Sequence, residues 1–270
     1  MSFLASCLMT VTLGFSREEI PALYNQTSLQ QYELAQNELA GVYFKGNETI
    51  LDVGCGDGKI TYEIARKVPF GKVYGIDASE EMISYASAYY QASNLIFLNQ
   101  KAEDCNIAEE FDYIISLSAF LWFNEPKKAF NHLTKKLKKG GKLIIVTPTK
   151  ESCDWVYYEK ALDDPRWKSF KSKSAYKNML FANDYINLAV FNRLFVQKFE
   201  MKRYHYQQRN LEEFKKYVKS WLFCYVDLPN DLIDDYLDIL AIEGQCQFTF
   251  SNEGDLLIPY DALTIEAEKI

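Results

Sequence analysis

The 270-residue sequence has few side chains suited to binding metal or forming cross-links. It contains only two histidines, His132 and His205, and its six cysteines include no Cys-x-x-Cys pair. This pattern argues against a structural zinc site and against a disulfide scaffold. We therefore expect no bound metal, and reduced thiols in a cytoplasmic protein.

Long apolar runs and a surplus of positive charge are also missing. No apolar stretch reaches the ~20 residues of a membrane-spanning helix, so we expect no membrane partner. The 30 Lys and Arg residues are outnumbered by 37 Asp and Glu residues, which gives a net charge of −7. Nucleic-acid phosphates are bound by a surplus of Lys and Arg, so this charge argues against a general nucleic-acid-binding protein.

The first 15 residues are apolar and could be mistaken for a secretory signal. No Lys or Arg precedes Arg17, so the positively charged start of such a signal is missing. We expect a mobile or over-extended start, or a packing segment, rather than an export signal.

Aromatic side chains are abundant. Tyr, Phe and Trp make up 15% of the chain, which is more than one core requires, so we expect some rings to line a pocket. Trp155, Trp167 and Trp221 either shape such a cavity or pack the segments around it. Five Lys or Arg residues within 166–177 form either a solvated helix face or a lid that attracts an anionic substrate.

Short β-branched runs alternate with helical patterns through the first half of the sequence. Helices are predicted at about residues 59–67, after Ser79, and from Pro126 onward. Gly140 and Gly141 are expected to end the last of these helices. Alternation of this kind predicts an α/β fold with a doubly wound, mostly parallel sheet. The predicted strands are residues 49–53, 73–77, 95–98, 111–116 and 142–146.

The second half does not continue this alternation of strands and helices, but it contains no linker or repeat. We therefore interpret residues 1–270 as one domain. Helical, ring-rich segments are predicted at 151–193 and 210–244, after the fifth and sixth strands. The sixth strand is expected near 194–206, and two later β segments near 247–250 and 257–268. We expect a helical lid in 1–48, a ligand-binding core in 49–150, and acceptor-binding insertions at 151–193 and 210–244.

A glycine-rich turn follows the first predicted strand, in the sequence Asp52-Val-Gly-Cys-Gly-Asp-Gly58. Glycines let the backbone approach a ligand closely and adopt positive φ. A dinucleotide fingerprint would have Gly or Ala where Lys59 stands, and a phosphate-binding P-loop is excluded by Val53 and Ile60. The G-x-G-x-G spacing therefore suits a ligand that has no pyrophosphate at the helix end.

An acidic residue ends the second predicted strand. Asp77 lies at the carboxyl edge of the sheet, where a carboxylate can accept hydrogen bonds from both hydroxyls of a ribose. A glycine turn, an acid at the end of the next strand and five alternating elements together indicate a nucleoside-binding site.

These residues resemble class I S-adenosylmethionine-dependent methyltransferases, from about Tyr24 to the C-terminus. The resemblance implies a Rossmann-like fold with a seven-stranded sheet, S-adenosyl-L-methionine as cofactor, S-adenosyl-L-homocysteine as product, and no metal. It assigns Asp52 to the loop and the cofactor amino group, and Asp77 to the ribose. The cofactor-binding residues it implies are Asp52, Gly54, Cys55, Gly56, Gly58, Asp77, Ala78, Met82, Ala102, Glu103 and Leu117.

The loop at 99–104, which the resemblance assigns to the adenine, departs from the family pattern. Lys101 stands where the family usually has an Asp that accepts the adenine amino group. Glu103 and Asp104 are the two candidates to replace that Asp, and Ala102 can still offer its backbone N–H.

Three further segments are similar to the trans-aconitate and juvenile-hormone-acid methyltransferases, which methylate small-molecule carboxylates. They are residues 24–30, 117–126 and 258–263. The resemblance implies that Gln30 and Trp122 border the acceptor pocket, although Trp122 could also be a core residue. Methyl esterification of a malonyl carrier protein uses a similar scaffold.

The predicted function is transfer of a methyl group from S-adenosylmethionine to a small-molecule acid, at a carboxylate oxygen. A carboxylate is already ionised at neutral pH and needs no base, so we expect positioning rather than a catalytic side chain. The alternatives are a methyltransferase for a carrier-protein-bound acid or RNA, and a catalytically silent cofactor-binding protein. The oligomeric state, and O- against N- or C-methylation, are left open.

Overall fold

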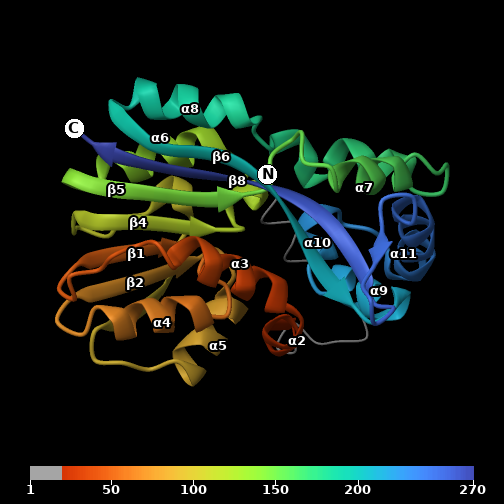
Figure 1. Cartoon of the computed structure of the whole chain (residues 1–270), viewed down its shortest axis with the longest axis horizontal. Helices are drawn as coiled ribbons and strands as arrows, with labels where there is room; N and C mark the ends of the chain where they lie inside the picture. Colours follow the sequence, from red (N-terminus) through yellow and green to blue (C-terminus); the bar gives the residue numbers. More distant parts are fainter. Residues whose placement is uncertain (1–19) are drawn as a thin grey trace.

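The computed structural model describes residues 20–270, and the predicted behaviour of residues 1–15 lies outside that range. One sheet of eight strands runs through the molecule in the order β3-β2-β1-β4-β5-β8-β6, with β7 paired to β8 at the side (Figure 1). Strands β1 to β5 are parallel, and β8 is antiparallel to both of its neighbours in that order. The predicted mostly parallel α/β sheet is confirmed, with eight strands instead of seven.

Strands and helices alternate through the first half of the described chain. Two helices precede the first strand, and two short 3-10 turns lie beside β4. The elements are α2 (Ile20–Thr27), α3 (Leu29–Leu39), β1 (Thr49–Val53), α4 (Lys59–Lys67), β2 (Lys72–Asp77), α5 (Glu80–Tyr89), β3 (Leu95–Asn99), η2 (Ala102–Asp104), β4 (Phe111–Leu117), η3 (Phe120–Trp122), α6 (Pro126–Lys135) and β5 (Leu137–Thr147).

The second half of the described chain is mainly helical. One group of helices lies between β5 and β6, and another between β6 and β7. The elements are α7 (Trp155–Ala161), η4 (Lys168–Lys173), η5 (Ala175–Asn178), α8 (Ala182–Phe191), β6 (Leu194–Gln208), α9 (Leu211–Lys219), α10 (Leu222–Tyr225), α11 (Asn230–Gly244), β7 (Thr249–Phe250) and β8 (Leu256–Lys269).

The centre of the sheet is formed by the apolar run of β1. Ile50, Leu51 and Val53 are almost fully buried, because β1 pairs with β2 on one side and β4 on the other. An apolar run without alternation is typical of a parallel strand covered on both faces. The predicted cap is also confirmed, since Ser79 Oγ accepts the backbone N–H of Met82 at 3.1 Å and begins α5.

The glycine pair after α6 has a different role from the predicted one. Helix α6 already ends at Lys135, and Gly140 and Gly141 lie inside β5. The pairing of β5 with β4 shifts register between Phe111 and Tyr113 at this place. A Cβ on Gly141 would lie only 2.8 Å from the Phe111 carbonyl oxygen, so glycine is needed where the two backbones come close.

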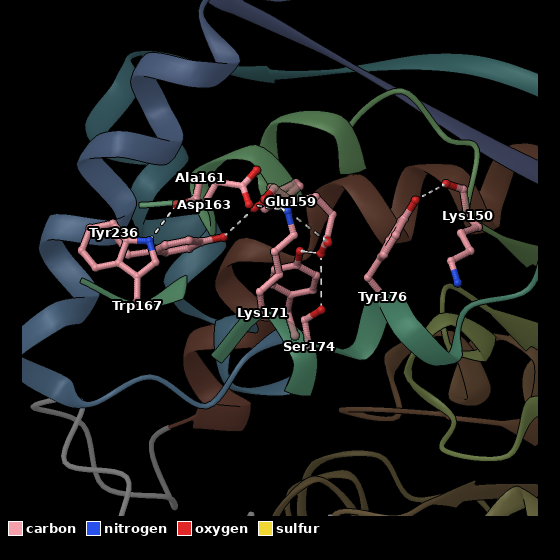
Figure 2. Close-up of polar contacts among 11 residues, drawn as sticks. Lys150, Glu159, Ala161, Asp163, Trp167, Lys171, Ser174, Tyr176 and Tyr236 are labelled. Carbon is pink, nitrogen blue, oxygen red and sulfur yellow. Dashed lines mark hydrogen bonds and ion pairs between the residues drawn. The ribbon is translucent and has the colours of Figure 1, made fainter. Parts of the chain in front are cut away.

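Strands β6 and β8 run past the ends of the other strands and carry a second layer of helices (Figure 1). Helices α7, α9, α10 and α11 gather at that end, away from β1 to β3. Trp167 is fully buried there, with its ring edge-on to Tyr236 and its Nε1 bonded to the Ala161 carbonyl oxygen at 2.7 Å (Figure 2). The packing role that we considered for Trp167 is therefore the correct one.

Helix α3 is tied to this sheet by one buried carboxylate. Glu38 accepts hydrogen bonds from Lys198 at 2.8 Å, Tyr204 at 2.6 Å and Thr264 at 2.9 Å, and from Lys202 at 3.2 Å. Burial opposes ionisation, but these four donors together lower the pKa of Glu38 to about 2. Within residues 20–270 no helix has the length and apolarity to cross a bilayer.

Candidate functional site

The glycine loop after β1 bends over the end of β2. The backbone N–H groups of Gly54 and Cys55 both donate to the Ile76 carbonyl oxygen, at 2.8 and 3.0 Å. Gly54 has φ +75°, and a Cβ there would stand 2.2 Å from the Cβ of Ala119. Gly56 and Gly58 also have positive φ, so the three glycines of the motif all adopt backbone conformations that other residues avoid.

Asp77 holds this loop from the next strand. Its Oδ2 accepts the Gly56 N–H at 3.0 Å and its Oδ1 accepts the Ser79 N–H at 2.9 Å. Burial raises the pKa of Asp77, although the backbone N–H groups partly offset that effect. The loop and the acid that the sequence singled out are thus in direct contact.

Asp52 lies under the loop at the end of β1. Its Oδ2 accepts the Thr61 hydroxyl at 2.7 Å, which links the strand to the first turn of α4. Burial, with a smaller contribution from the Asp77 charge, raises the pKa of Asp52 to about 7 despite the Thr61 hydrogen bond. Cys55 is buried between the two acids, and burial raises the pKa of its thiol, so it is not an activated nucleophile.

Helix α2, part of the segment 1–48 expected to form a helical lid, covers the loop from outside. The ring of Tyr24 lies 3.6 Å from the place where a Cβ on Gly56 would stand. Asn25 Nδ2 donates to Asp57 Oδ2 at 2.6 Å, so the helix is hydrogen-bonded to the loop as well as packed on it. Burial raises the pKa of Asp57.

The predicted adenine loop lies beside β3 and α6. Lys101 is exposed, and Ala102 is buried in the short turn η2. The two candidate acceptors for the adenine amino group already have partners: Glu103 accepts the Glu125 N–H at 3.2 Å, and Asp104 pairs with Lys128 at 3.0 Å. The structure therefore favours neither acid over the other.

The end of β4 carries a strained residue next to a predicted one. Leu117 is half-buried, and Ser118 after it has φ +54°, unusual for a residue with a side chain. The Ser118 N–H donates to the Val146 carbonyl oxygen at 2.7 Å, which holds the turn in place. Strain of this kind concentrates at functional sites. Of the other predicted residues, Ala78 is exposed and Met82 half-buried in the first turn of α5.

A cavity lies between this edge of the sheet and the second layer of helices. It is open to solvent on one side. Gln30 and Trp122, the two residues predicted to border an acceptor, both line it. No Lys, Arg or His of the described chain is among its lining residues. Its walls are mainly aromatic, formed by Tyr24, Trp122, Trp155, Tyr158, Tyr206, Tyr217, Trp221 and Tyr260.

Four of these rings form one cluster. The centroid of Trp122 is 6.4 Å from that of Trp155, with the rings perpendicular, and 5.6 Å from that of Trp221. Tyr158 joins them at 5.3 Å from Trp155 and 5.4 Å from Trp221. Trp155 and Trp221 therefore shape the cavity, whereas Trp167 packs the layer behind it.

Orphaned polar atoms concentrate in the same cavity. In residues 20–270, six buried side-chain polar atoms have no hydrogen-bond partner, and five of them belong to residues that line it. Buried polar groups are normally paired, so such a concentration indicates groups that await a ligand. The five atoms are Gln30 Oε1, Gln31 Oε1, Asp154 Oδ1, Trp155 Nε1 and Trp221 Nε1.

The basic cluster of 166–177 does not face this cavity. Lys171 Nζ donates to Asp163 Oδ1 at 2.9 Å and to the Glu159 carbonyl oxygen at 2.9 Å, as Figure 2 shows. Arg166 pairs with Asp164 and Asp235. These two cations stabilise the fold of the insertion itself, which supports the solvated-face interpretation for them.

Neither histidine lines the cavity. His132 Nε2 contacts the Cys105 carbonyl oxygen at 2.6 Å, on helix α6. His205 is exposed on β6, opposite Pro259 of β8. Asp154 is the titratable acid that lines the cavity, and sequence reasoning missed it because no motif surrounds it.

Comparison with known proteins decides the family. Residues 44–216 match a family model described as a methyltransferase domain, and this match covers more than half of the chain. The chain belongs to the methyltransferase domain family. The match includes the glycine loop, Asp77 and the first group of cavity helices.

Relatives of this methyltransferase-domain protein match over part of their length. It is 30% identical over 164 residues to the putative methyltransferase 235L of Invertebrate iridescent virus 6, covering 61% of this chain and 59% of that protein. It is 31% identical over 111 residues to the malonyl-[acyl-carrier protein] O-methyltransferase of Priestia megaterium, covering 41% of this chain and 40% of that protein. The chain thus spans less than two thirds of the length of either relative.

Solved structures extend the likeness to most of the chain. The YcgJ protein of Bacillus subtilis superposes with a TM-score of 0.63 at 18% identity, covering 88% of this chain and 98% of that chain. At this identity the likeness concerns the fold alone. It confirms the Rossmann-like α/β class expected for the methyltransferase-domain protein.

Proposed function

We propose that the protein transfers the methyl group of S-adenosylmethionine to a carboxylate oxygen of a small-molecule acid and releases S-adenosylhomocysteine. One observation carries the proposal: Tyr24 packs over the glycine loop and also lines the aromatic cavity. A cofactor that contacts both the loop and Asp77 would therefore face an acceptor in the cavity. Membership of the methyltransferase domain family supports the reaction type.

The charges around the loop suit a cationic cofactor. Asp52, Asp57 and Asp77 form no ion pair with a Lys or Arg within the described chain, and neutral donors hold all three. The amino group and the sulfonium of S-adenosylmethionine are both positive, so these acids favour its binding. Asp77 already has a fixed orientation and keeps lone pairs for the ribose hydroxyls.

The other cofactor contacts follow from the same placement. The backbone of the glycine loop would pass under the methionine part, and the start of α5 and the turn η2 would flank the adenosine. Beyond the three acids, the residues proposed to contact the cofactor are Gly54, Cys55, Gly56, Gly58, Ala78, Met82, Ala102, Glu103 and Leu117.

When bound, the cofactor supplies a methyl group on a positively charged sulfur that leaves as a neutral thioether. The side chains of this protein then have to orient the acceptor and exclude water, which can account for ~7–11 kcal/mol of a barrier. The Asn25–Asp57 hydrogen bond keeps α2 over the loop and so helps to exclude water. An ionised carboxylate needs no proton removed, so no base enters the mechanism.

The unpaired indole N–H groups offer a way to orient the acceptor. Trp155 Nε1 and Trp221 Nε1 are buried donors without partners, and an indole can only donate. Two neutral donors can hold a carboxylate without the ion pair that would reduce its reactivity. The unpaired atoms of Gln30 and Gln31 are their Oε1 oxygens, which can accept a hydrogen bond from a donor group elsewhere on the acceptor.

A carrier-protein-bound acid is the second candidate acceptor. The Priestia megaterium relative is a malonyl-[acyl-carrier protein] O-methyltransferase, and its reaction also joins a methyl group to a carboxylate. The cavity opens to solvent, so a tethered acid could reach it. A screen that offers both free acids and acyl-carrier proteins separates the two candidates.

Calorimetry with S-adenosylhomocysteine tests the cofactor half of the proposal. We expect binding to the parent protein and at least about tenfold weaker binding to Asp77→Ala, since a hydrogen bond to a charged group contributes ~1.5–3 kcal/mol. The exposed Asp227 provides the matched control, because Asp227→Ala removes a carboxylate that is outside the glycine loop and does not line the cavity. No binding at millimolar ligand, or equal binding by Asp77→Ala and the parent, would refute the proposal.

Transfer of a radiolabelled methyl group tests the reaction half. Pooled small acids, acyl-carrier proteins and tRNA are offered separately with labelled S-adenosylmethionine. We expect label in the small-acid pool, in a product that mild alkali cleaves as an ester. Label only in the carrier proteins would favour the second candidate, and tight cofactor binding without any transfer would indicate a catalytically silent protein.

A further inference from the structure

Asp154 is an acid inside the aromatic cavity. It directly precedes α7, is only 9% exposed, and lines the cavity with Trp155. Its side chain makes no capping hydrogen bond to the helix, and its Oδ1 has no partner in the described chain. Burying a carboxyl oxygen without a hydrogen bond costs free energy. Such an atom in a cavity wall therefore indicates that a ligand supplies the missing hydrogen bond.

Arg203, which is linked through Asp261 to the residue before Asp154, is already paired. Arg203 donates from Nε and Nη2 to both oxygens of Asp261, at 2.8 and 3.0 Å. Asp261 also accepts the Cys153 N–H at 3.0 Å, next to Asp154 in the chain. With no Lys, Arg or His of the described chain in the cavity wall, the charge of Asp154 is not balanced by the protein.

The walls around Asp154 favour positive charge. Aromatic ring faces carry negative potential and attract ammonium groups, most strongly when the groups are removed from water. Trp155, Tyr158 and Trp221 are packed into one cluster, and all three line the cavity with Asp154. A carboxyl oxygen among such rings forms the kind of site that binds a protonated amine.

We propose that Asp154 binds a protonated amine on the acceptor, so that the acceptor is an acid that also carries a cationic amine, such as an amino acid. The inference rests on the proposed function and extends it to the substrate class. The unpaired indole N–H groups would hold the carboxylate of the acceptor, and Asp154 would hold its amine. The specificity of the cavity then comes from two opposite charges on one ligand.

A neutral hydroxyl on the acceptor explains the site less well. Burial, with a smaller contribution from the Asp261 charge, raises the pKa of Asp154 to about 7. A hydroxyl would add one hydrogen bond but would not compensate a desolvated charge, whereas an ammonium group does both. A second carboxylate at this position would be repelled once Asp154 is ionised.

Two pairs of small probes test the proposal with S-adenosylhomocysteine bound, so that no turnover occurs. L-Phenylalanine and 3-phenylpropanoate differ only in the amine, and 2-phenylethylamine and 2-phenylethanol differ in amine against hydroxyl. At about pH 8 we expect the amine member of each pair to bind at least about tenfold more tightly than the other member. Tryptophan fluorescence and calorimetry measure the affinities. Equal affinity within both pairs, including no binding by all four at ten millimolar, overturns the proposal.

The variant Asp154→Asn assigns any preference to this residue. We expect it to lose the preference for the amine members while S-adenosylhomocysteine still binds, with Asp227→Asn as the matched control. An unchanged preference in Asp154→Asn overturns the proposal. If Asp154→Asn does not fold, the comparison of the probe pairs on the parent protein still decides. Failure to bind S-adenosylhomocysteine would instead refute the proposed function, so the two failures are distinguishable.

Discussion

The Asp77 carboxylate and the Gly56 backbone N–H are joined by a hydrogen bond of 3.0 Å, from the end of β2 to the loop after β1. The contact orients the acid and the loop together before any ligand is present. A carboxylate that is already fixed loses little freedom when it binds a ligand, which favours affinity.

Replacing Gly58 tests whether the loop needs glycine for space as well as for conformation. Gly58 has φ +84°, and a Cβ there would stand 2.6 Å from the Ala86 Cβ and 2.7 Å from the Phe97 ring. We expect Gly58→Ala to lower the free energy of unfolding by about 2–5 kcal/mol, through ~1–2 kcal/mol of backbone strain and ~1–3 kcal/mol of overpacking. Urea unfolding measures the loss.

The matched control for that variant is Gly140→Ala. Gly140 has φ +76°, but nothing lies within 4 Å of the added Cβ, so only backbone strain applies. We expect a loss of about 1–2 kcal/mol. Equal losses in the two variants would show that the close contacts at Gly58 carry no cost.

Cofactor binding should strengthen as the pH rises through the pKa of Asp52, which is about 7. The folded protein without cofactor holds a proton on Asp52 that the unfolded chain releases at lower pH, so its stability falls as pH rises toward 7. The positive amino group of the cofactor favours the ionised acid and expels that proton. Calorimetry with S-adenosylhomocysteine should give affinity that increases between about pH 6 and pH 8, by at most about tenfold per unit for one proton.

The variant Asp52→Asn isolates this effect. We expect its affinity to vary less with pH than that of the parent, because the amide cannot titrate. Heats measured in buffers of different ionisation enthalpy should also show fewer protons released on binding. An identical pH dependence in parent and variant would assign the titration to another group.

Helix α2 should control how long the cofactor stays bound. Asn25→Ala removes the hydrogen bond to Asp57, and we expect S-adenosylhomocysteine to dissociate about three- to tenfold faster, since the bond is only partly buried. Stopped-flow displacement measures the rate. Gln26→Ala changes an exposed neighbour on the same helix and should leave the rate unchanged.

Removing an unpaired indole N–H should separate binding from stability. We expect Trp155→Phe and Trp221→Phe to weaken acceptor binding. The free energy of unfolding should fall by less than it does for a Trp→Phe change at a hydrogen-bonded indole, because no internal hydrogen bond is lost. Acceptor KM and urea unfolding give the two quantities.

Trp167→Phe is the control with the opposite expectation. Trp167 Nε1 is bonded to the Ala161 carbonyl oxygen, so this variant leaves a buried acceptor unpaired and should cost about 1–3 kcal/mol more than the cavity variants, without changing acceptor KM. A similar stability loss in all three variants would mean that the cavity indoles are not free donors.

The glycine loop could be predicted from sequence because its signals are local. Glycines at 54, 56 and 58 and an acid ending the next strand follow from backbone geometry and from the parallel arrangement of β1 and β2. The same local reasoning misplaced Gly140 and Gly141. A glycine pair can end a helix or let two strands approach, and only the pairing partner of β5 distinguishes the two.

The cavity could not be predicted in the same way. It joins Tyr24 to Trp155, Trp221 and Tyr260, which are brought together by packing between distant segments. Sequence resemblance placed Gln30 and Trp122 there, and the structure adds Asp154. Nothing in the local sequence distinguishes that acid from the paired Asp163 and Asp164 on the outer side of the same insertion.

Glu38 has a consequence for the timing of turnover. Its four hydrogen bonds fasten α3 to β6 and β8, so α3 cannot swing aside as a rigid flap. For the proposed function, we expect spent cofactor to leave past α2, the eight-residue helix over the glycine loop, rather than past α3. The release step of each turnover would then depend on how readily that short helix moves.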